Sequence, residues 1–504
     1  ELRQVCMHSW QAAARIGGHD RRGESVALLN PADSAHAVGR VCEADRQDVE
    51  RALALAADAA LPWDAAGGYK RATILLTAAD RFEEKAPELI ARVIREGGRT
   101  LRDAIAEVRE AVDFCRYYAL QAKQEFERPR SLPGPTGEKN ELQLHGRGVF
   151  ACISPWNFPL AIFVGQIAAA LAAGNSVLAK PARQTPLTGY HTICLLHEAG
   201  VPADVLHFLP GSGAAIGAQI LPDRRLSGVA FTGSTDTAWK IQRALADRQG
   251  AIVPLIAETG GQNVMIADSS ALPEQLVVDV LQSAFNSAGQ RCSALRVLFV
   301  QNEIAARVIR LLAAAMQEIQ IGDPLLLASD VGPLIDQDAA RSLQPHVARL
   351  QREARLLQRV DPPQTLQAGC FFPLQAFELE SLALLEKEVF GPVLHVVRYR
   401  ADKLEQVIDA VNNTGYGLTL GVHSRIEETW LRVQARARVG NLYINRNMIG
   451  AVVGAQPFGG EGLSGTGPKA GGPYYLHRFA TERTLSVNTA AVGGNTGLLS
   501  LPED

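Results

Sequence analysis

The sequence is short of the features that mark several classes of protein. Its longest apolar run, residues 160–173, is interrupted by Gly165 and Gln166 and falls short of the ~20 residues that a membrane-spanning helix needs. The seven cysteines are scattered, odd in number and without a CxxC pair, which excludes a disulfide framework and a zinc site, and no other metal is expected. No charged-then-apolar leader opens the chain at Glu1. We therefore expect a cytoplasmic protein.

Charge and composition are those of an ordered globular protein. The 50 Lys and Arg against 53 Asp and Glu give a net charge of −3, which offers no general attraction to phosphate backbones, so nucleic acid is not an expected partner. With 47% hydrophobic and 20% charged residues, the chain can bury large cores. At 504 residues it should divide into two or three domains.

The order of the predicted elements indicates an α/β fold. Residues 1–45 read as irregular. Helices are expected over residues 45–60, 69–97 (two helices) and 100–127. From Gly148, buried strands alternate with helices, and a second alternating block begins at Asn263. Such alternation builds parallel sheets with helices on both faces. The first block has expected strands at 148–154, 176–180, 205–209 and 228–232 and helices at 160–173, 187–199 and 214–221; the second has strands at 263–267 and 295–301 and helices at 273–287 and 303–319.

One stretch places a thiol in a setting that suits catalysis. Cys292 follows Gly289 and stands beside the cation Arg291, just before a strand-like run that starts at Leu295. Positive surroundings lower the pKa of a thiol, and only the thiolate is a nucleophile. The alternative is that Cys292 is a small buried hydrophobe.

Two further polar residues fit a thiol mechanism. Glu258 stands in a Thr-Gly-Gly turn between the two blocks, where burial would raise its pKa and make it a base near neutral pH. Asn157 follows a buried strand and is suited to one half of an oxyanion hole, with the backbone N–H of Cys292 as the other half.

Signals for a dinucleotide are present at the ends of the predicted strands. Residues 211–217 follow a strand and open a helix, but their spacing is GxGxxxG, one residue longer than the usual fingerprint, and an ordinary turn is an equal alternative. Lys180 ends a buried strand, where it can donate to ribose hydroxyls or simply extend to solvent. Ser234 follows another strand and is available to a phosphate.

These groups fit one reaction. A thiolate adds to an aldehyde, hydride leaves to a nicotinamide to give a thioester, and water activated by a carboxylate releases an acid.

Six motifs stand in the order that is typical of the aldehyde dehydrogenase superfamily, which the chain resembles over roughly residues 25–485. They are residues 154–159 (SPWNFP), 180–182 (KPA), 231–234 (FTGS), 258–261 (ETGG), 289–292 (GQRC) and 388–392 (EVFGP). Within the superfamily the chain is most similar to the C-terminal dehydrogenase domains of the bacterial proline utilization A family, through residues 104–114, 283–295 and 445–454. Those domains oxidise L-glutamate γ-semialdehyde to L-glutamate in the second step of proline catabolism.

The resemblance implies a division of the chain. A Rossmann-like NAD(P)-binding domain would comprise residues 1–127 and 148–257, and a catalytic domain residues 258–446. A β-hairpin oligomerisation flap would comprise residues 128–147 and 474–490. Residues 447–473 would form a substrate-anchor loop and a Gly-rich segment.

The resemblance also implies residue roles. Cys292 would be the nucleophile, Glu258 the base that releases the acid, and Asn157 the oxyanion donor. Lys180 and Glu388 would meet ribose hydroxyls. The full set of implied cofactor contacts is Ile153, Ser154, Pro155, Trp156, Lys180, Ala182, Arg183, Gly213, Gly217, Phe231, Thr232, Gly233, Ser234, Thr259, Gly260, Glu388 and Phe390.

The proposed substrate carries a carboxylate and an ammonium group away from its reacting carbon. Gly450 and Ala451 would offer backbone N–H groups to the carboxylate. Glu110, on the long helix, would meet the ammonium group, with Glu107 as the alternative because one helical step is within the error of placement. The remaining implied contacts are the hydroxyl of Ser293, the neighbouring Arg291, and the rings of Phe158 and Phe458 around the aliphatic middle.

One departure bears on the cofactor. Relatives commonly have an acidic residue where this chain has Arg183, and that acid favours the 2′-hydroxyl of the adenosine ribose over a 2′-phosphate. We expect NAD, and Arg183 leaves NADP open.

The resemblance has consequences for partners. Proline utilization A proteins join this domain to a proline dehydrogenase domain, which these residues do not include, so the chain is either a homodimer through its flap or a fragment of a larger enzyme. Two alternatives to the proposed activity are an aldehyde dehydrogenase of another specificity and a non-catalytic relative. The presence of Cys292, Glu258, Asn157 and Glu388 together argues against the second.

Overall fold

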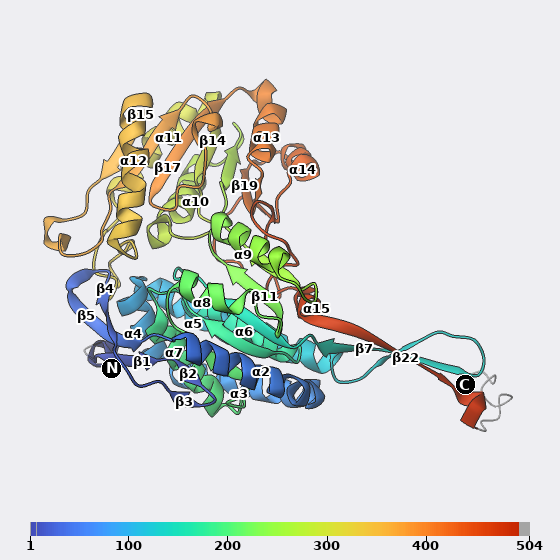
Figure 1. The fold of residues 1–504 in the computed structure, drawn as a ribbon. Coiled ribbons are helices and arrows are strands. Elements are labelled where there is room, and N and C mark those ends of the chain that lie inside the picture. Colours follow the sequence, from blue (N-terminus) through green and yellow to red (C-terminus); the bar gives the residue numbers. More distant parts are fainter. Residues whose placement is uncertain (1, 7, 493–504) are drawn as a thin grey trace.

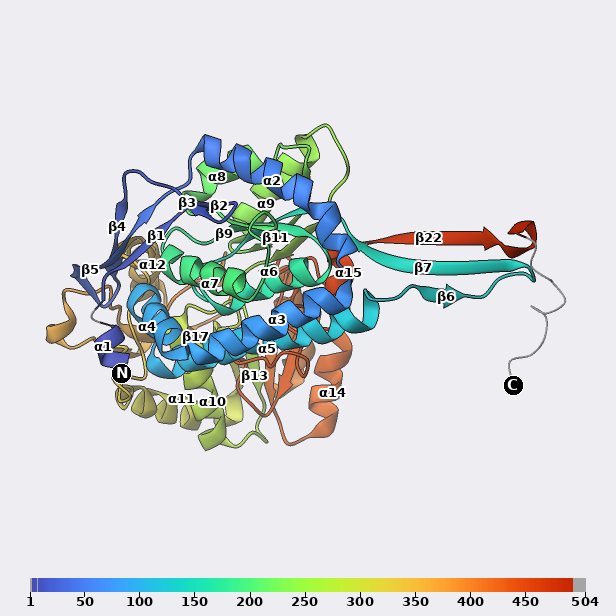
Figure 2. The same ribbon diagram turned by 90° about the horizontal axis from the view of Figure 1, so that it is seen from below.

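Two parallel sheets of seven strands each organise the part of the chain that this computed structural model describes, residues 2–6 and 8–492. The first sheet lies in the lower, blue-to-green part of Figure 1 and the second in the upper, yellow-to-orange part. A narrow three-stranded ribbon extends away from both (Figures 1 and 2).

The first sheet carries helices on both faces, and its strands show this in their side chains. Val149 and Ala151 pack with helices on one face, whereas Phe150 and Cys152 pack with helices on the other. A strand with apolar contacts on both faces has no polar alternation, as expected for a parallel sheet. The strand order is β12 (Leu255–Glu258), β11 (Leu226–Thr232), β8 (Val149–Ile153), β9 (Ser176–Lys180), β10 (Leu206–Phe208), β2 (Arg15–Ile16) and β3 (His19–Asp20), and only β2 and β3 run antiparallel to their neighbours.

Four of the helices around this sheet, α2, α5, α8 and α9, begin at a residue whose side chain caps them. Asp45 accepts hydrogen bonds from the N–H groups of Gln47 and Asp48 at the start of α2, and the side chain of Asp48 accepts one from the N–H of Asp45. The helices are α2 (Arg46–Ala65), α3 (Gly68–Glu84), α4 (Ala86–Gly97), α5 (Leu101–Glu125), α6 (Ala161–Ala172), α7 (Pro186–Glu198), α8 (Gly213–Ile220) and α9 (Thr235–Asp247).

The second sheet is parallel except at one edge, where β15 pairs antiparallel with β16. Its order is β15 (Arg355–Val360), β16 (Leu374–Leu379), β17 (Val393–Tyr399), β14 (Val297–Gln301), β13 (Val264–Ala267), β19 (Thr419–His423) and β20 (Asn441–Ile444). The helices of this unit are α10 (Pro273–Phe285), α11 (Asn302–Gln317), α12 (Gln337–Glu353), α13 (Leu404–Asn413) and α14 (Glu427–Arg436).

The prediction that residues 1–45 are irregular is wrong. They contain a short helix, α1 (Leu2–Val5), the last two strands at one end of the first sheet, β2 and β3, and a separate sheet of β1 (Trp10–Ala13), β5 (Asp33–Cys42) and β4 (Val26–Asn30). The pattern was missed because β4 is mostly exposed and β2 and β3 are two residues long, so neither shows a buried alternation. Their pairing is set by tertiary contacts, such as Trp10 against Val38 and Leu187.

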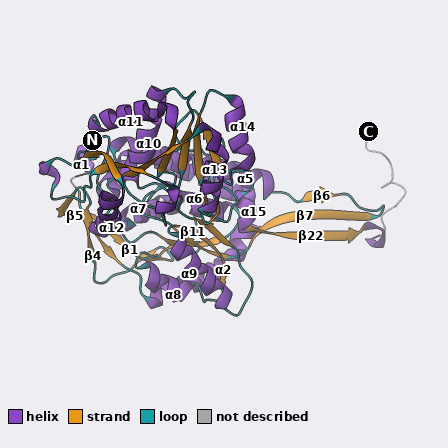
Figure 3. Ribbon diagram, turned by 90° about the horizontal axis from the view of Figure 1, so that it is seen from above, coloured by secondary structure: helices purple, strands orange, loops and turns teal. Residues whose placement is uncertain are grey.

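The ribbon consists of β6 (Arg130–Leu132), β7 (Glu138–Gly146) and β22 (Ala480–Asn488). β22 pairs antiparallel with β7 over its whole length and forms one edge, with most of its side chains exposed. Figure 3 shows the ribbon projecting beyond the helices. In the part of the chain that the structure describes, no helix has both the length and the hydropathy to cross a bilayer. The remaining short elements, in which η marks a 3-10 helix, are η1 (Asn286–Gly289), η2 (Gln364–Leu366), η3 (Leu382–Leu384), η4 (Ala401–Lys403), β18 (Tyr416–Gly417), β21 (Glu461–Gly462), α15 (Tyr475–Phe479) and η5 (Thr489–Val492).

Asn175 joins the ribbon to the first sheet, and its loss should destabilise the fold. Its fully buried side chain donates to the carbonyls of Ala170 and Phe479 and accepts from the N–H groups of Arg147 and Gly148. Asn175→Ala leaves these backbone groups unsatisfied, which should lower the free energy of unfolding by about 3 kcal/mol.

Urea unfolding followed by circular dichroism measures this change. Asn140→Ala is the control, because within the described part of the chain the amide of Asn140 bonds only to the exposed Glu138, at 3.5 Å, and its loss should change stability by less than about 0.5 kcal/mol. Equal effects of the two substitutions would contradict the role given to Asn175.

Candidate active site

A left-handed turn presents Cys292 to the interior. After α10 the chain passes through Ser287, Ala288 and Gly289 with φ of 56°, 55° and 66°. A Cβ on Gly289 would lie 2.2 Å from the carbonyl oxygen of Gly391, so only glycine fits there. The turn ends α10 and places Arg291, Cys292 and Ser293 ahead of β14. We call residues 286–293 the nucleophile segment.

A cavity of about 110 Å³ opens in front of this segment. It is lined by Cys292 and Glu258 and by side chains from α5, α6 and the segment 450–458. A largely apolar cavity with a few convergent polar groups is the usual form of a small-molecule site. All the residues proposed from the sequence as substrate contacts line it: Glu110, Phe158, Arg291, Ser293, Gly450, Ala451 and Phe458.

Glu258 ends β12 and is enclosed by the Gly-rich segment. Its Oε2 accepts a hydrogen bond from the N–H of Gly460 at 3.1 Å, while its buried Oε1 has no hydrogen-bond partner among the described residues. A Cβ on Gly459 would approach Oε1 to 2.7 Å. Burial raises the pKa of Glu258 to about 8, against the opposing effects of the Gly460 N–H and Lys469. The carboxyl group is therefore mostly protonated at pH 7. Above its pKa of about 8 it is mostly ionised and can act as a base.

The surroundings of Cys292 favour the neutral thiol. Burial, followed by the charges of Glu388 and Glu258, raises its pKa to about 12, although the N–H of Ser293 and the charge of Arg291 lower it. Arg291 acts on the thiol in the expected direction, since its charge lowers the pKa of Cys292, but burial outweighs it. The thiol needs a base or an added positive charge to ionise.

Asn157 lies beside the nucleophile segment. Its side-chain Nδ2 donates to the carbonyl oxygen of Gln290 at 3.1 Å. An amide nitrogen carries two N–H groups, and the second has no acceptor among the described residues, but Asn157 itself does not line the cavity. Asn263 holds the segment from another side, since its Nδ2 donates to the carbonyl oxygens of Cys292 (2.6 Å) and Ala294 (2.9 Å).

The structure separates the two acids that the sequence left as alternatives. Glu110 lines the cavity, whereas Glu107 is 1% exposed and its Oε1 accepts from the N–H groups of Leu160 and Ala161 at the start of α6. Burial, with the charges of Glu107 and Asp113, raises the pKa of Glu110 to about 7, and Arg291 and Arg99 oppose this.

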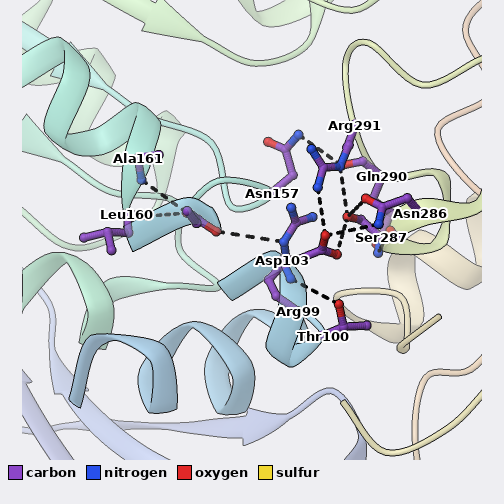
Figure 4. Close-up of polar contacts among 11 residues, drawn as sticks. Arg99, Thr100, Asp103, Asn157, Leu160, Ala161, Asn286, Ser287, Gln290 and Arg291 are labelled. Carbon is purple, nitrogen blue, oxygen red and sulfur yellow. Dashed lines mark hydrogen bonds and ion pairs between the residues drawn. The ribbon is translucent and has the colours of Figure 1, made fainter. Parts of the chain in front are cut away.

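Two arginines flank the ring of Phe158. The guanidinium carbons of Arg99 and Arg291 lie 4.8 and 5.2 Å from its centroid. Arg291 also forms an ion pair with Asp103 at 2.9 Å, and Figure 4 shows Asp103 facing Asn286, Ser287 and Arg291. Phe158 is thus fixed between two cations whose charge buried carboxylates on α5 balance.

The carboxyl ends of β8, β9 and β11 meet at one edge of the first sheet, where open α/β sheets bind ligands. Lys180 ends β9 with 4% exposure, and burial lowers its pKa to about 8. Ser234 caps α9 by accepting from the N–H of Thr237, and Gly213 opens α8, so two helix N-termini face this edge with their positive ends.

Side chains pack closely against two glycines at this edge of the sheet. A Cβ on Gly233 would lie 2.6 Å from the ring of Phe231, and one on Gly260 would lie 1.7 Å from Glu388. Glu388 forms an ion pair with Arg296 at 3.3 Å. Phe390 meets Trp156 edge-on at 5.6 Å, across the two units. These residues leave open backbone, a carboxylate and a lysine, a set that fits a dinucleotide.

Comparison with known protein families gives a match over most of the chain. The model of the aldehyde dehydrogenase family matches residues 19–485. The chain belongs to the aldehyde dehydrogenase family. The predicted family is thereby confirmed.

Three relatives illustrate the range of similarity. The bifunctional protein PutA of Salmonella typhimurium is 52% identical over 95% of this chain, but the chain spans only 36% of that protein. A 1-pyrroline-5-carboxylate dehydrogenase of Geobacillus thermodenitrificans is 35% identical over 94% of this chain and 92% of its own length. The crystal structure of the Thermus 1-pyrroline-5-carboxylate dehydrogenase with bound NAD superposes with a TM-score of 0.91, at 33% identity, over 97% of this chain and 95% of that one. This match confirms the predicted α/β fold with parallel sheets.

The remaining residues proposed for the cofactor of this aldehyde dehydrogenase lie at or beside the same edge. Ile153 ends β8, and the side chain of Ser154 donates to Gln166, which in turn donates to Thr232. Arg183 is exposed, with its Nε 3.4 Å from Glu43. Pro155 and Ala182 follow β8 and β9, Gly217 lies within α8, and Thr259 lines the cavity next to Glu258.

Sequence reasoning missed three residues of this site. Asp103 stands four and seven residues before Glu107 and Glu110, and an acidic stripe at that spacing on an amphipathic helix was the available signal. Asn263 follows the ETGG motif closely, but its side chain bonds to the carbonyl oxygens of Cys292 and Ala294, 29 and 31 positions further along the chain. No local sequence pattern indicates such contacts. Glu43 is remote in sequence from every motif.

The raised pKa of Glu258 predicts the pH dependence of turnover. Only the ionised carboxylate can take a proton from water, so kcat for an uncharged aldehyde such as butanal should rise with pH through about 8 and level off above it. Steady-state rates at saturating substrate between pH 6 and 10 measure the profile.

Glu258→Gln provides the control. It should lower kcat by about 10²-fold or more and remove the rise. A wild-type profile that is flat between pH 6.5 and 9 would contradict the role of Glu258 as a base.

Proposed function

We propose that this chain oxidises L-glutamate γ-semialdehyde, the open form of Δ1-pyrroline-5-carboxylate, to L-glutamate with NAD as the acceptor. The observation that carries the proposal is one cavity lined both by Cys292 with Glu258 and by Glu110, an acid available to an ammonium group. The names of the Geobacillus and Thermus relatives support the same substrate. The reaction would be the second step of proline catabolism.

Chemistry begins at Cys292. Its thiol gives up a proton to solvent water, and the thiolate adds to the aldehyde carbon to form a thiohemiacetal. The oxyanion accepts hydrogen bonds from the Asn157 amide and the Cys292 N–H. When bound, NAD supplies the acceptor for the hydride that leaves this carbon, so that a thioester remains on Cys292.

Glu258 completes the reaction. Its carboxylate takes a proton from a water molecule, the hydroxide adds to the thioester carbonyl, and the Cys292 thiolate leaves as glutamate forms. The closed fit of the Gly-rich segment over Glu258 supports this role, because it limits access to the carboxylate and keeps its pKa raised.

The ammonium and carboxylate groups at the far end of the substrate would give specificity, because the cavity offers a partner to each. Glu110, with a pKa of about 7, is ionised by an approaching ammonium group, and Phe158 and Phe458 pack on the aliphatic chain. Gly450 has a φ of 73° and open space where a Cβ would stand, so its backbone and that of Ala451 are accessible to a carboxylate. Ser293 adds a hydroxyl from the nucleophile segment.

The cofactor edge would hold NAD through groups of this chain. Lys180 and Glu388 would meet the ribose hydroxyls, and Ser234 with the N-terminus of α9 the pyrophosphate. Glu43 would set the preference between NAD and NADP. Its carboxylate lies beside Arg183 and influences the pKa of Lys180, so it neutralises the cation that a 2′-phosphate would need.

The assembly and location of the protein follow from the same reading. The domain division given above, with residues 1 and 7 outside the described part, places the cofactor on the first sheet and Cys292 on the second. β22, as a ribbon edge, would pair with a second copy to give a homodimer. In a longer protein such as the PutA relatives, a proline dehydrogenase domain would be the partner. A cytoplasmic location is part of this proposal.

The test of the function is NADH formation from Δ1-pyrroline-5-carboxylate. Glu110→Gln should raise KM for this substrate about tenfold or more, because it loses a charge-assisted hydrogen bond, and should leave kcat within about threefold. Cys292→Ala, the control, should abolish turnover. A wild-type chain that forms no NADH, or an unchanged KM in Glu110→Gln, would contradict the proposal.

The role of Glu43 is tested by direct binding. Quenching of protein fluorescence gives the Kd of NADH and NADPH, and Glu43→Gln should improve the affinity for NADPH relative to NADH about tenfold. Glu274→Gln is the control, since Glu274 on α10 also pairs with an exposed arginine, Arg307 on α11, away from the cofactor edge. An unchanged ratio in Glu43→Gln would show that another group selects the cofactor.

A further inference from the structure

The carboxylate of Asp103 accepts hydrogen bonds from three side chains of the nucleophile segment. Its Oδ1 accepts from Asn286 Nδ2 at 3.1 Å and from Arg291 Nη2 at 2.9 Å, and its Oδ2 accepts from Ser287 Oγ at 2.8 Å. Asp103 is 5% exposed and lies in the first turn of α5, a helix of the other unit (Figure 4). No other side chain of α5 bonds to this segment among the described residues.

We infer that Asp103 is a positioning residue for Cys292. It holds the nucleophile segment at a fixed position against the face of α5 that carries Glu110. The inference rests on the proposed function in so far as Cys292 is taken as the nucleophile. Asp103 touches neither the cavity nor the sulfur, so it acts through Asn286, Ser287 and Arg291.

The segment needs such a tie because its backbone is strained. Ser287 and Ala288 both have left-handed φ values, which cost an L-residue roughly 1–2 kcal/mol each. Such a conformation persists only where neighbouring contacts fix it. The bonds from Asn286 and Ser287 to Asp103 fix the turn at its first two residues, five and six positions before Cys292.

The same carboxylate also orders the substrate end of the cavity. Arg291 is held by Asp103 on one side and lies over Phe158 on the other. Glu110 stands two turns after Asp103 on α5, and the charged groups acting on it are Glu107, Asp113, Arg99 and Arg291. Glu258, Cys292 and Tyr475 are the other titratable groups that line the cavity. α5 thus carries both Asp103, which holds the nucleophile segment, and Glu110, the proposed partner of the ammonium group.

Removal of the charge of Asp103 should have a signature at Glu110. Arg291 and Arg99 would lose a carboxylate that compensates them, so the surroundings of Glu110 would become more positive and its pKa would fall. Because the ionised form of Glu110 binds the ammonium group, KM for the semialdehyde rises as pH falls below the pKa of Glu110. Asp103→Asn should move that rise to lower pH.

The experiment compares Asp103→Asn with wild type on Δ1-pyrroline-5-carboxylate and on butanal between pH 6 and 9. We expect kcat to fall about tenfold or more on both substrates, KM for butanal to stay within about twofold, and the rise in KM for the semialdehyde to shift by half a pH unit or more. Asp268→Asn is the matched control: Asp268 is also buried with three hydrogen bonds, from Ser270 and Ser424, but at the opposite end of β13 from Asn263. It should lose stability without these kinetic changes.

Asn286→Ala keeps the inference testable if Asp103→Asn does not fold. It removes one of the three bonds and should lower kcat two- to fivefold on both substrates. Unchanged kcat in either variant, or an equal fall in Asp268→Asn, would overturn the inference. A wild type that oxidises butanal but not the semialdehyde would refute the proposed substrate, and a fall in butanal turnover in Asp103→Asn would still support the positioning role.

Discussion

The active site depends on a group of buried charges between α5 and the nucleophile segment. Arg99 and Arg291 are both buried, and an uncompensated buried cation costs several kcal/mol. Asp103 and Glu107 supply the compensation, and burial of the Asp103 carboxyl is outweighed by Arg291 and Arg99, which hold its pKa below the usual value. Since α5 belongs to the first unit and the segment to the second, this charge balance holds the two units at the spacing that the cavity needs.

Burial, by contrast, favours the neutral forms of three other groups of the site. Burial raises the pKa of Glu110 to about 7, of Glu258 to about 8 and of Cys292 to about 12. An empty cavity with three added negative charges would be poorly solvated. Ionisation is therefore coupled to what enters: an ammonium group beside Glu110, and a reacting carbon at Cys292. In this account the substrate supplies part of the charge that activates the site.

The sequence was informative where function sits at the ends of elements. Lys180, Glu258 and Cys292 could be proposed because each follows or precedes a recognisable strand, and chemistry in parallel sheets gathers at those ends. The strands of residues 10–42 could not be predicted, because short exposed strands are paired by tertiary contacts. Asp103 was missed because its partners stand 183 to 188 positions away. The direction of the Cys292 pKa shift could not be predicted, because the sequence shows the neighbouring Arg291 but neither the burial of the thiol nor the charges of Glu388 and Glu258 that act on it from other elements.

The most direct test of the whole account is the ratio of kcat/KM for L-glutamate γ-semialdehyde to that for butanal, which lacks the amino and carboxyl groups. Two charge-assisted contacts worth about 1.5 kcal/mol each predict a ratio of about 100 or more. A ratio near one at pH 7.5 would show that the cavity does not recognise the amino acid end of the substrate, and would contradict the account.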